Sequence, residues 1–153
     1  MIKKIIIFII IIIVASLFSC AKREPARSPA SDDLINKIGE QFNLNIRIEE
    51  KEAEKLFDEK NDMDFSKIEN FAVRQSECGE VGIFKLYTAV NADYIKEAAQ
   101  DRILKLQADA RNLESLSVAN NAEVRSYGNY VYYVAHDYKD KIFKLIENEL
   151  RGV

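Results

Sequence analysis

Near its C-terminus the chain reads Val124-Arg125-Ser126-Tyr127-Gly128-Asn129-Tyr130-Val131-Tyr132-Tyr133-Val134, and the expected architecture can be built outward from this segment. Two runs rich in β-branched and aromatic residues flank Gly128-Asn129. Such a Gly-X pair is typical of a two-residue hairpin loop with glycine at a positive φ. The second run, residues 131–135, has the composition of an inner strand. The segment therefore predicts a β-hairpin with a buried second strand.

A second hairpin is predicted upstream, over residues 71–90. In residues 71–76 apolar and polar positions alternate, with Phe71, Val73 and Gln75 on one side, which indicates a half-buried strand. Residues 81–90 are apolar on both faces apart from two positions, as is typical of a central strand covered on both sides. Residues 77–80 are expected to form the connecting loop.

Helical spacing of apolar residues predicts helices before and after these hairpins. The first begins at Ser31 and has Gly39 as its expected stop. The second, over residues 50–60, is charged nearly all round and is expected on the surface. The last is expected to be capped by Asp137 and to end at Gly152. Its buried stripe consists of Phe143, Ile146 and Leu150.

The longest helix is predicted between the two hairpins, with Asn91 and Asp93 as candidate caps. Its apolar residues recur at steps of three and four, which predicts a face packed on the sheet. This stripe consists of Ile95, Ala99, Ile103, Leu106, Ala110 and Leu113. The helix is expected to fray or bend over residues 111–117.

These elements predict an α+β fold in the order α-α-β-β-α-β-β-α. Paired strands separated by helices favour an antiparallel sheet of about four strands, made of two hairpins, with helices packed on one face. Residues 31–153 are enough for one domain with its own core.

The chain resembles a family of small Gram-positive lipoproteins that share a domain of unknown function. The resemblance lies in the hairpin at residues 124–134 and in residues 80–86, which precede a long charged helix. The resemblance covers residues 32–150, and its most specific part is Gly128-Asn129-Tyr130-Val131. It implies the same order of elements and a lipidated location. It implies no catalytic residue, ligand or partner.

The first 19 residues match a secretory signal peptide. A basic start is followed by an apolar run of about 14 residues, short of the roughly 20 needed to span a bilayer. The sequence Leu17-Phe18-Ser19-Cys20 resembles a lipobox, although a smaller residue is usual where Phe18 stands. We predict cleavage after Ser19 and lipidation of Cys20, which anchors the protein to the outer face of the cell membrane. A cysteine ending an ordinary signal, or an uncleaved anchor, would also place the domain outside.

Residues 20–30 contain both prolines of the chain and have no apolar periodicity, which predicts an extended tether. With this tether extended at about 3.1 Å per residue, the domain can stand on the order of 30 Å from the lipid surface. Its basic residues, Lys22, Arg23 and Arg27, can meet anionic headgroups or be solvated as in an ordinary linker.

Charge and cysteine content restrict the possible functions. Without the signal peptide the chain carries 20 basic and 25 acidic side chains, a net charge of about −5 that disfavours nucleic acid as a partner. Lipidation of Cys20 leaves Cys78 alone, so no disulfide is expected within the chain.

Few side chains suggest chemistry. Cys78 lies in a predicted loop beside Glu77 and Glu80, whose carboxylates raise the pKa of a thiol and blunt its reactivity. His136 is the only histidine, and we expect a surface or packing residue rather than a general base or metal ligand. The carboxylates are expected at helix caps and solvated faces. We therefore predict no catalytic residue, no metal and no cofactor.

The most suggestive polar feature is a cluster of tyrosines in the last hairpin. Tyr127, Tyr130, Tyr132 and Tyr133 form the candidate interaction surface, and Tyr138 follows them. Alternation along a strand means that they cannot all face one side, so some are expected in the core. Exposed tyrosines suit protein or sugar partners.

The leading hypothesis is a non-catalytic binding or interaction module that presents the sheet or the last hairpin to an envelope protein or glycan. A solute-binding accessory of a transporter is the alternative, although two-lobed receptors are usually longer. An envelope enzyme is the third hypothesis.

Overall fold

The computed structural model describes residues 28–61, 63–77 and 79–152. The predicted signal peptide, the lipidation site Cys20 and the tether as far as residue 27 lie outside these residues, as does Cys78. Within the described part, no helix is both long enough and apolar enough to cross a membrane.

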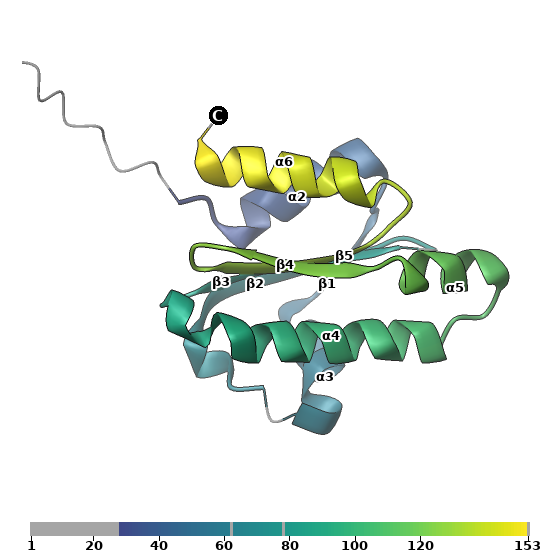
Figure 1. The fold of residues 1–153 in the computed structure, drawn as a ribbon, viewed down its shortest axis with the longest axis horizontal. Helices are drawn as coiled ribbons and strands as arrows, with labels where there is room; N and C mark the ends of the chain where they lie inside the picture. Colours follow the sequence, from purple (N-terminus) through teal and green to yellow (C-terminus); the bar gives the residue numbers. More distant parts are fainter. Residues whose placement is uncertain (1–27, 62, 78, 153) are drawn as a thin grey trace, which may run out of the picture.

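The described residues fold into five strands, five α-helices and two short 3-10 helices. Their bounds in chain order are α2 Ser31–Phe42, β1 Ile46–Ile48, α3 Glu50–Asn61, η1 Phe65–Lys67, β2 Ile68–Gln75, β3 Glu80–Leu86, η2 Ala89–Asn91, α4 Ala92–Ala108, α5 Leu113–Asn120, β4 Glu123–Tyr127, β5 Tyr130–Ala135 and α6 Lys139–Arg151. All pairings are antiparallel and the strand order is β1-β2-β3-β5-β4 (Figure 1). The predicted α+β class and order of elements are confirmed. The additional strand, β1, has three residues, too few for alternation to reveal it.

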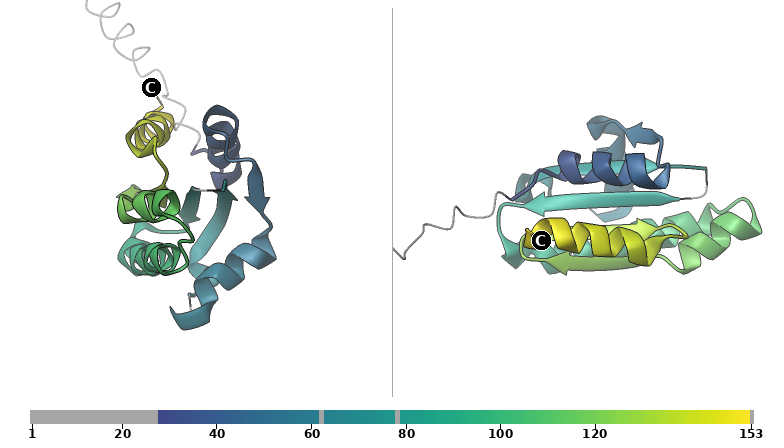
Figure 2. Two further views of the ribbon diagram at one scale, coloured as in Figure 1. Left: turned by 90° about the vertical axis from the view of Figure 1, so that its right-hand side faces the viewer. Right: turned by 90° about the horizontal axis from the view of Figure 1, so that it is seen from above.

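Helices cover both faces of the sheet, so the expectation that they pack on one face is wrong. Helices α2 and α6 lie on one face, and α3 and α4 lie on the other (Figures 1 and 2). The reason lies in the inner strands, where β5 is buried at all six positions and β3 at six of seven. A strand that is apolar on both sides needs a covering layer on both sides.

The predicted hairpin at Gly128-Asn129 is confirmed. Tyr127 pairs with Tyr130 across the loop, and Gly128 has a φ of 57°. A positive φ at the first of two loop residues is what a tight hairpin turn requires, and glycine adopts it without a Cβ clash.

The central strand β3 is confirmed as covered on both sides, but it ends at Leu86 rather than near residue 90. At that point the Leu86 N–H donates to the Asn129 carbonyl over 2.8 Å, and the Asn129 side chain donates to the Leu86 carbonyl over 2.8 Å. These contacts with the β4–β5 loop fix the end of the strand, and the chain turns into η2.

The predicted long helix is divided into two. Helix α4 ends at Ala108, and α5 begins at Leu113 after a capping box in which Asn112 and Ser115 bond to each other's backbone N–H. Ala110 therefore lies between the helices, and Leu113 is 85% exposed rather than part of a buried stripe. The cap at Asn112 is the local signal for this break.

The ends of α2 and α6 differ from prediction at two positions. Helix α2 continues past Gly39 to a left-handed C-cap at Asn43, and Gly39 instead gives room to the Arg74 side chain: a Cβ there would lie 2.6 Å from Arg74 Nη1. Helix α6 ends at Gly152 as predicted, but it begins after Tyr138 without a side-chain cap from Asp137.

Candidate functional site

Three of the four tyrosines proposed as an interaction surface lie in the core. Tyr130 and Tyr132 pack on the α2 and α6 side of the sheet, whereas Tyr133 packs on the α3 and α4 side. Only Tyr127, which is 40% exposed, reaches the surface. The four residues therefore do not form one exposed patch, because β5 is an inner strand and both of its faces are covered.

The surface that the last hairpin does present is the outer edge of β4. This strand ends the strand order, and no other strand of the described residues pairs with this free edge. Tyr127 and Tyr130 flank the two-residue loop. In such a closing pair, the backbone N–H of each residue donates to the backbone C=O of the other, so the backbone groups of Tyr127 face β5. The bonding direction alternates along a strand. The backbone N–H and C=O of Val124 and Ser126 therefore face away from β5, toward the free edge.

Charged side chains of β4 are held against α6 and away from the free edge. Arg125 Nε donates to Glu123 Oε1 over 2.7 Å, and Arg125 Nη1 donates to Glu147 Oε1 over 3.2 Å. The Arg125 guanidinium also lies 4.0 Å from the centre of the Phe143 ring. Lys139 Nζ lies 3.2 Å from Glu123 Oε2. Arg125 thus bridges the strand and the helix, and the outward backbone groups are left uncovered by these charges.

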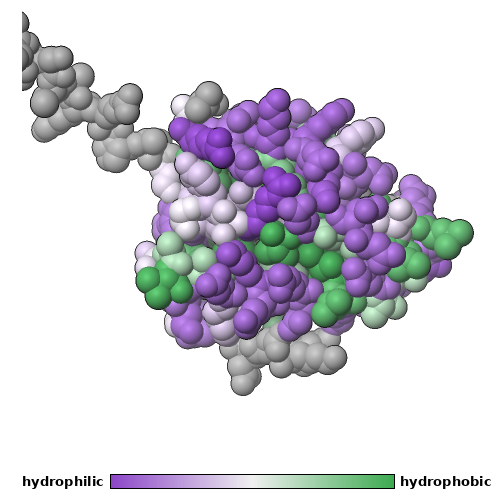
Figure 3. All heavy atoms as spheres, viewed as in Figure 1, coloured by the Kyte–Doolittle hydropathy of each residue, from purple (hydrophilic) through white to green (hydrophobic). Residues whose placement is uncertain are grey.

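The other face of β4 is less polar. The Val124 side chain is half-buried against the core of the α3 and α4 side, and Ser126 beyond it is exposed. The space-filling view shows apolar residues at the level of β4 and at the end of α5, with polar surface above and below (Figure 3). The edge therefore has a charged face beside α6 and an apolar face beside α4.

A buried charge cluster lies beneath α4, where the sequence predicted only solvated carboxylates. The Glu80 carboxylate is 2% exposed and Arg102 is 7% exposed. Arg102 Nε and Nη2 donate to the two carboxylate oxygens over 2.8 and 2.6 Å, and the Tyr133 hydroxyl donates to Oε1 over 2.5 Å. The Gln75 amide also donates to Oε2. Glu80 thus has four donors from β2, β5 and α4.

The electrostatics of this cluster favour one charge state. Burial acts to lower the pKa of Arg102, but the hydrogen bonds and charge of Glu80 outweigh it and raise that pKa. Burial, followed by the charge of Glu80, raises the pKa of Tyr133 well above its usual value. The two-point ion pair between Glu80 and Arg102, with the hydrogen bond from Tyr133, fixes α4 on the sheet.

Gly82 makes this cluster possible. It pairs with Tyr133 across β3 and β5, and a Cβ at Gly82 would lie 2.1 Å from Cε1 of the Tyr133 ring. The ring therefore passes directly over the glycine, which lets its hydroxyl reach Glu80 two residues along β3.

A hollow of about 380 Å³ lies near this cluster, at the end of the sheet next to α5. Its walls come from the end of β2, the start of β3, the α4–α5 connection and the start of α5. Polar residues along it include Gln75, Glu77, Glu80, Asp109, Arg111 and Ser115.

His136 is half-buried and packs between two aromatic rings. Its ring lies 6.4 Å from that of Phe42 and 5.7 Å from that of Tyr138, and Nδ1 accepts a hydrogen bond from the Tyr138 N–H over 3.1 Å. Burial lowers the pKa of His136, opposed by the charge of Asp137. Among the described residues, no group of three or more histidine, cysteine, aspartate or glutamate side chains is placed to hold a metal ion.

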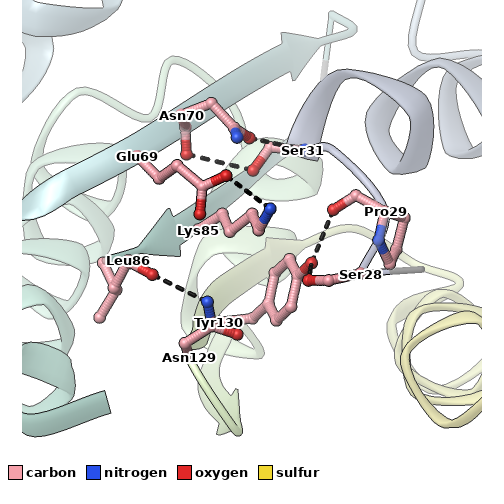
Figure 4. Close-up of polar contacts among 9 residues, drawn as sticks. All are labelled: Ser28, Pro29, Ser31, Glu69, Asn70, Lys85, Leu86, Asn129 and Tyr130. Carbon is pink, nitrogen blue, oxygen red and sulfur yellow. Dashed lines mark hydrogen bonds and ion pairs between the residues drawn. The ribbon is translucent and has the colours of Figure 1, made fainter. Parts of the chain in front are cut away.

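The last residues of the predicted tether contact the domain. The Tyr130 hydroxyl donates to the Pro29 carbonyl over 2.6 Å and is also hydrogen-bonded to the Ser28 hydroxyl (Figure 4). Ser31 N–H donates to Asn70 Oδ1 over 2.8 Å, and the Ser31 hydroxyl donates to the Asn70 carbonyl over 3.2 Å. The chain therefore enters the domain at a defined place, next to the β4–β5 loop.

No family model, curated protein or solved structure matches this chain. The resemblance to small Gram-positive lipoproteins stays a prediction.

Proposed function

We propose that this chain is anchored by lipid to the outer face of the cell membrane and that its domain binds an extended segment of an envelope protein along β4. The free edge of β4 carries the proposal, because the backbone groups of Val124 and Ser126 face outward while neighbouring charges are held against α6. A strand added to such an edge is bound through main-chain hydrogen bonds and is selected by alternate side chains. The predicted signal peptide and Cys20 give the location.

The two faces of β4 specify the chemistry of the bound segment. Beside α6, an added strand would meet Glu123 and Arg125, which favour charged residues of either sign. Beside α4 it would meet Val124, which favours an apolar residue. The expected partner segment therefore alternates charged and apolar residues, as an edge strand with two different faces requires.

Ser126→Pro tests the edge directly. Proline removes the outward N–H of residue 126 but leaves the inward ladder bonds of its neighbours, so the fold is expected to persist. Ser126→Thr is the matched control because it keeps the N–H. The tagged full-length chain and both variants are cross-linked in intact cells, and the cross-linked peptides are identified by mass spectrometry.

We expect wild type and Ser126→Thr to give the same adduct, which joins β4 to a segment with the alternating pattern, and Ser126→Pro to lose it. Equal recovery of that adduct by Ser126→Pro would overturn the proposal. An adduct that joins two copies of β4 would replace the envelope partner with self-association.

The anchor has its own test. Mass spectrometry of the mature protein is expected to show an N-terminus at Cys20 with added acyl mass, and Cys20→Ser is expected to lose that mass and leave the membrane fraction. A mature chain that retains residues 1–19 would contradict the anchor without affecting the β4 experiment.

The hollow near α5 supports a second candidate, capture of a small polar solute. Its volume of about 380 Å³ is within the range of small-molecule sites. A solute that binds there should raise the thermal midpoint of the wild type, and Ser115→Trp, which fills the hollow, should abolish the shift. A screen of amino acids, sugars and short peptides without a shift would exclude this candidate.

A further inference from the structure

The place where the chain enters the domain also marks one end of the molecule. The Tyr130 hydroxyl holds Ser28 and Pro29, and Asn129 beside it exchanges hydrogen bonds with Leu86 (Figure 4). Figure 1 shows the start of the described chain, the β4–β5 turn and η2 at one end of the sheet, and α5 at the other end. The tether and the segment after Leu86 therefore share an end.

The segment after Leu86 exposes two large side chains. Tyr87 is 67% exposed and Val90, in η2, is 88% exposed. The segment is nevertheless fixed, because the Tyr87 N–H donates to the Lys67 carbonyl over 3.2 Å and the Thr88 side chain caps η2. Val90 is apolar, and Tyr87 beside it has an apolar ring and a polar hydroxyl. An apolar side chain next to an amphipathic tyrosine suits a membrane interface.

We propose that this end of the domain faces the bilayer and that Tyr87 and Val90 contact the lipid interface. The proposal rests on the lipid anchor proposed above. Eight peptide steps separate Cys20 from Ser28, and they span at most about 28 Å. Ser28 is fixed at this end of the domain. For the α5 end to come as close to the bilayer, the chain between Cys20 and Ser28 would first have to run back along the sheet. Strand β3 alone extends about 23 Å, which would use most of the reach of that chain.

The sequence contains no tryptophan, so a single substitution introduces a unique fluorescent probe. Val90→Trp places it at the proposed contact. Leu113→Trp is the matched control, because Leu113 is also apolar and is 85% exposed but lies at the α5 end. The full-length lipidated chains are reconstituted in vesicles of phosphatidylcholine that contain brominated phosphatidylcholine, an uncharged surface on which apolar contact alone is tested.

In vesicles, the emission of Val90→Trp is expected to shift to shorter wavelength and to be largely quenched by the brominated lipid, whereas Leu113→Trp keeps the spectrum of an exposed tryptophan. Adding Tyr130→Phe to Val90→Trp removes the hydroxyl that holds Ser28 and Pro29, and is expected to reduce the quenching.

Three outcomes overturn the proposal. Quenching of Leu113→Trp equal to that of Val90→Trp would show that the domain has no preferred orientation. An unquenched Val90→Trp on chains that float with the vesicles would show that the anchor holds but this end does not touch lipid. Chains that fail to float would contradict the anchor and this inference together.

Discussion

Two arginine–carboxylate pairs of nearly equal length lie in different regions of this domain. In the inner region, Arg102 Nη2 and Glu80 Oε2 are 2.6 Å apart under α4, and at the edge Arg125 Nε and Glu123 Oε1 are 2.7 Å apart. The inner side chains are 7% and 2% exposed, and the edge side chains are 36% and 40% exposed. Both pairs join a guanidinium to a carboxylate, but water reaches the edge pair and is excluded from the inner pair.

That difference separates a structural role from a surface role. In the inner region each charge depends on its partner, because neither can be solvated, so the pair fixes α4 against β3. At the edge, water solvates both charges, and the pair contributes little to stability. The consequence at the edge is positional, because Arg125 also bonds Glu147 and Glu123 also pairs with Lys139, both in α6. These contacts hold the side chains against α6 and leave the outward backbone groups of β4 open.

The largest expected effect comes from Arg102→Met, which leaves Glu80 as an uncompensated buried charge. The free energy of unfolding should fall by about 3–5 kcal/mol, whereas Arg125→Met at the edge should lose less than about 1 kcal/mol. Urea denaturation measures both. If Arg102→Met does not fold, Glu80→Gln in the same chain should restore part of the stability. Equal losses from the two arginine variants would remove the distinction.

Glycine substitutions should separate the regions by a smaller amount. Gly82→Ala places a Cβ against the Tyr133 ring and should cost about 3 kcal/mol through overpacking. Gly128→Ala meets no atom within 4 Å, but its φ of 57° disfavours a side chain by about 1–2 kcal/mol. Gly128→Asn should recover part of that loss, since asparagine tolerates the left-handed region. Thermal unfolding gives the order of the three variants, and a reversed order would contradict this account.

Removal of one tyrosine hydroxyl should also reduce stability more in the inner region than at the edge. Tyr133→Phe deletes a hydrogen bond to the buried Glu80 carboxylate and should cost about 2 kcal/mol, as expected for a bond to a charged group. Tyr127→Phe, on the edge strand, should change stability by less than about 0.5 kcal/mol. Chemical denaturation of the pair provides the measurement, and no effect at residue 133 would mean that Glu80 is satisfied without the tyrosine.

The smallest expected effect is a pH dependence at the edge. The hydrogen bond from Arg125 lowers the pKa of Glu123 below 4.5, with burial opposing it. This stabilisation is present above pH 4.5 and is lost as the pH falls through the pKa of the folded state. Between about pH 6 and about pH 3, wild type should lose more stability than Glu123→Gln, by less than about 1 kcal/mol because the pair is exposed. Parallel losses would exclude the contribution.

The sequence predicted the features that depend on neighbours in the chain. The glycine at residue 128 fixed the hairpin, and the apolar run after residue 80 identified the central strand. The sequence did not reveal the hydrogen-bonded ion pair between Glu80 and Arg102, which lie 22 residues apart. A signal was present, because Arg102 falls on the apolar face of α4 between Ala99 and Ile103, where a charged residue needs a partner. The identity of that partner has no local signature.

The amino-acid sequence was enough to predict the hairpins and the order of helices and strands, because apolar periodicity, glycine at a positive φ and cap residues act over a few positions. The route of export that it indicates stays a prediction. The tertiary structure was needed to show that both faces of the sheet are covered and that three tyrosines are buried. It also showed that, in the described part of the chain, no strand pairs with the outer edge of β4. It also placed Ser28 beside Tyr130. These properties depend on contacts between residues far apart in the chain, and burial, which local sequence does not encode, determines what each charged or aromatic side chain does.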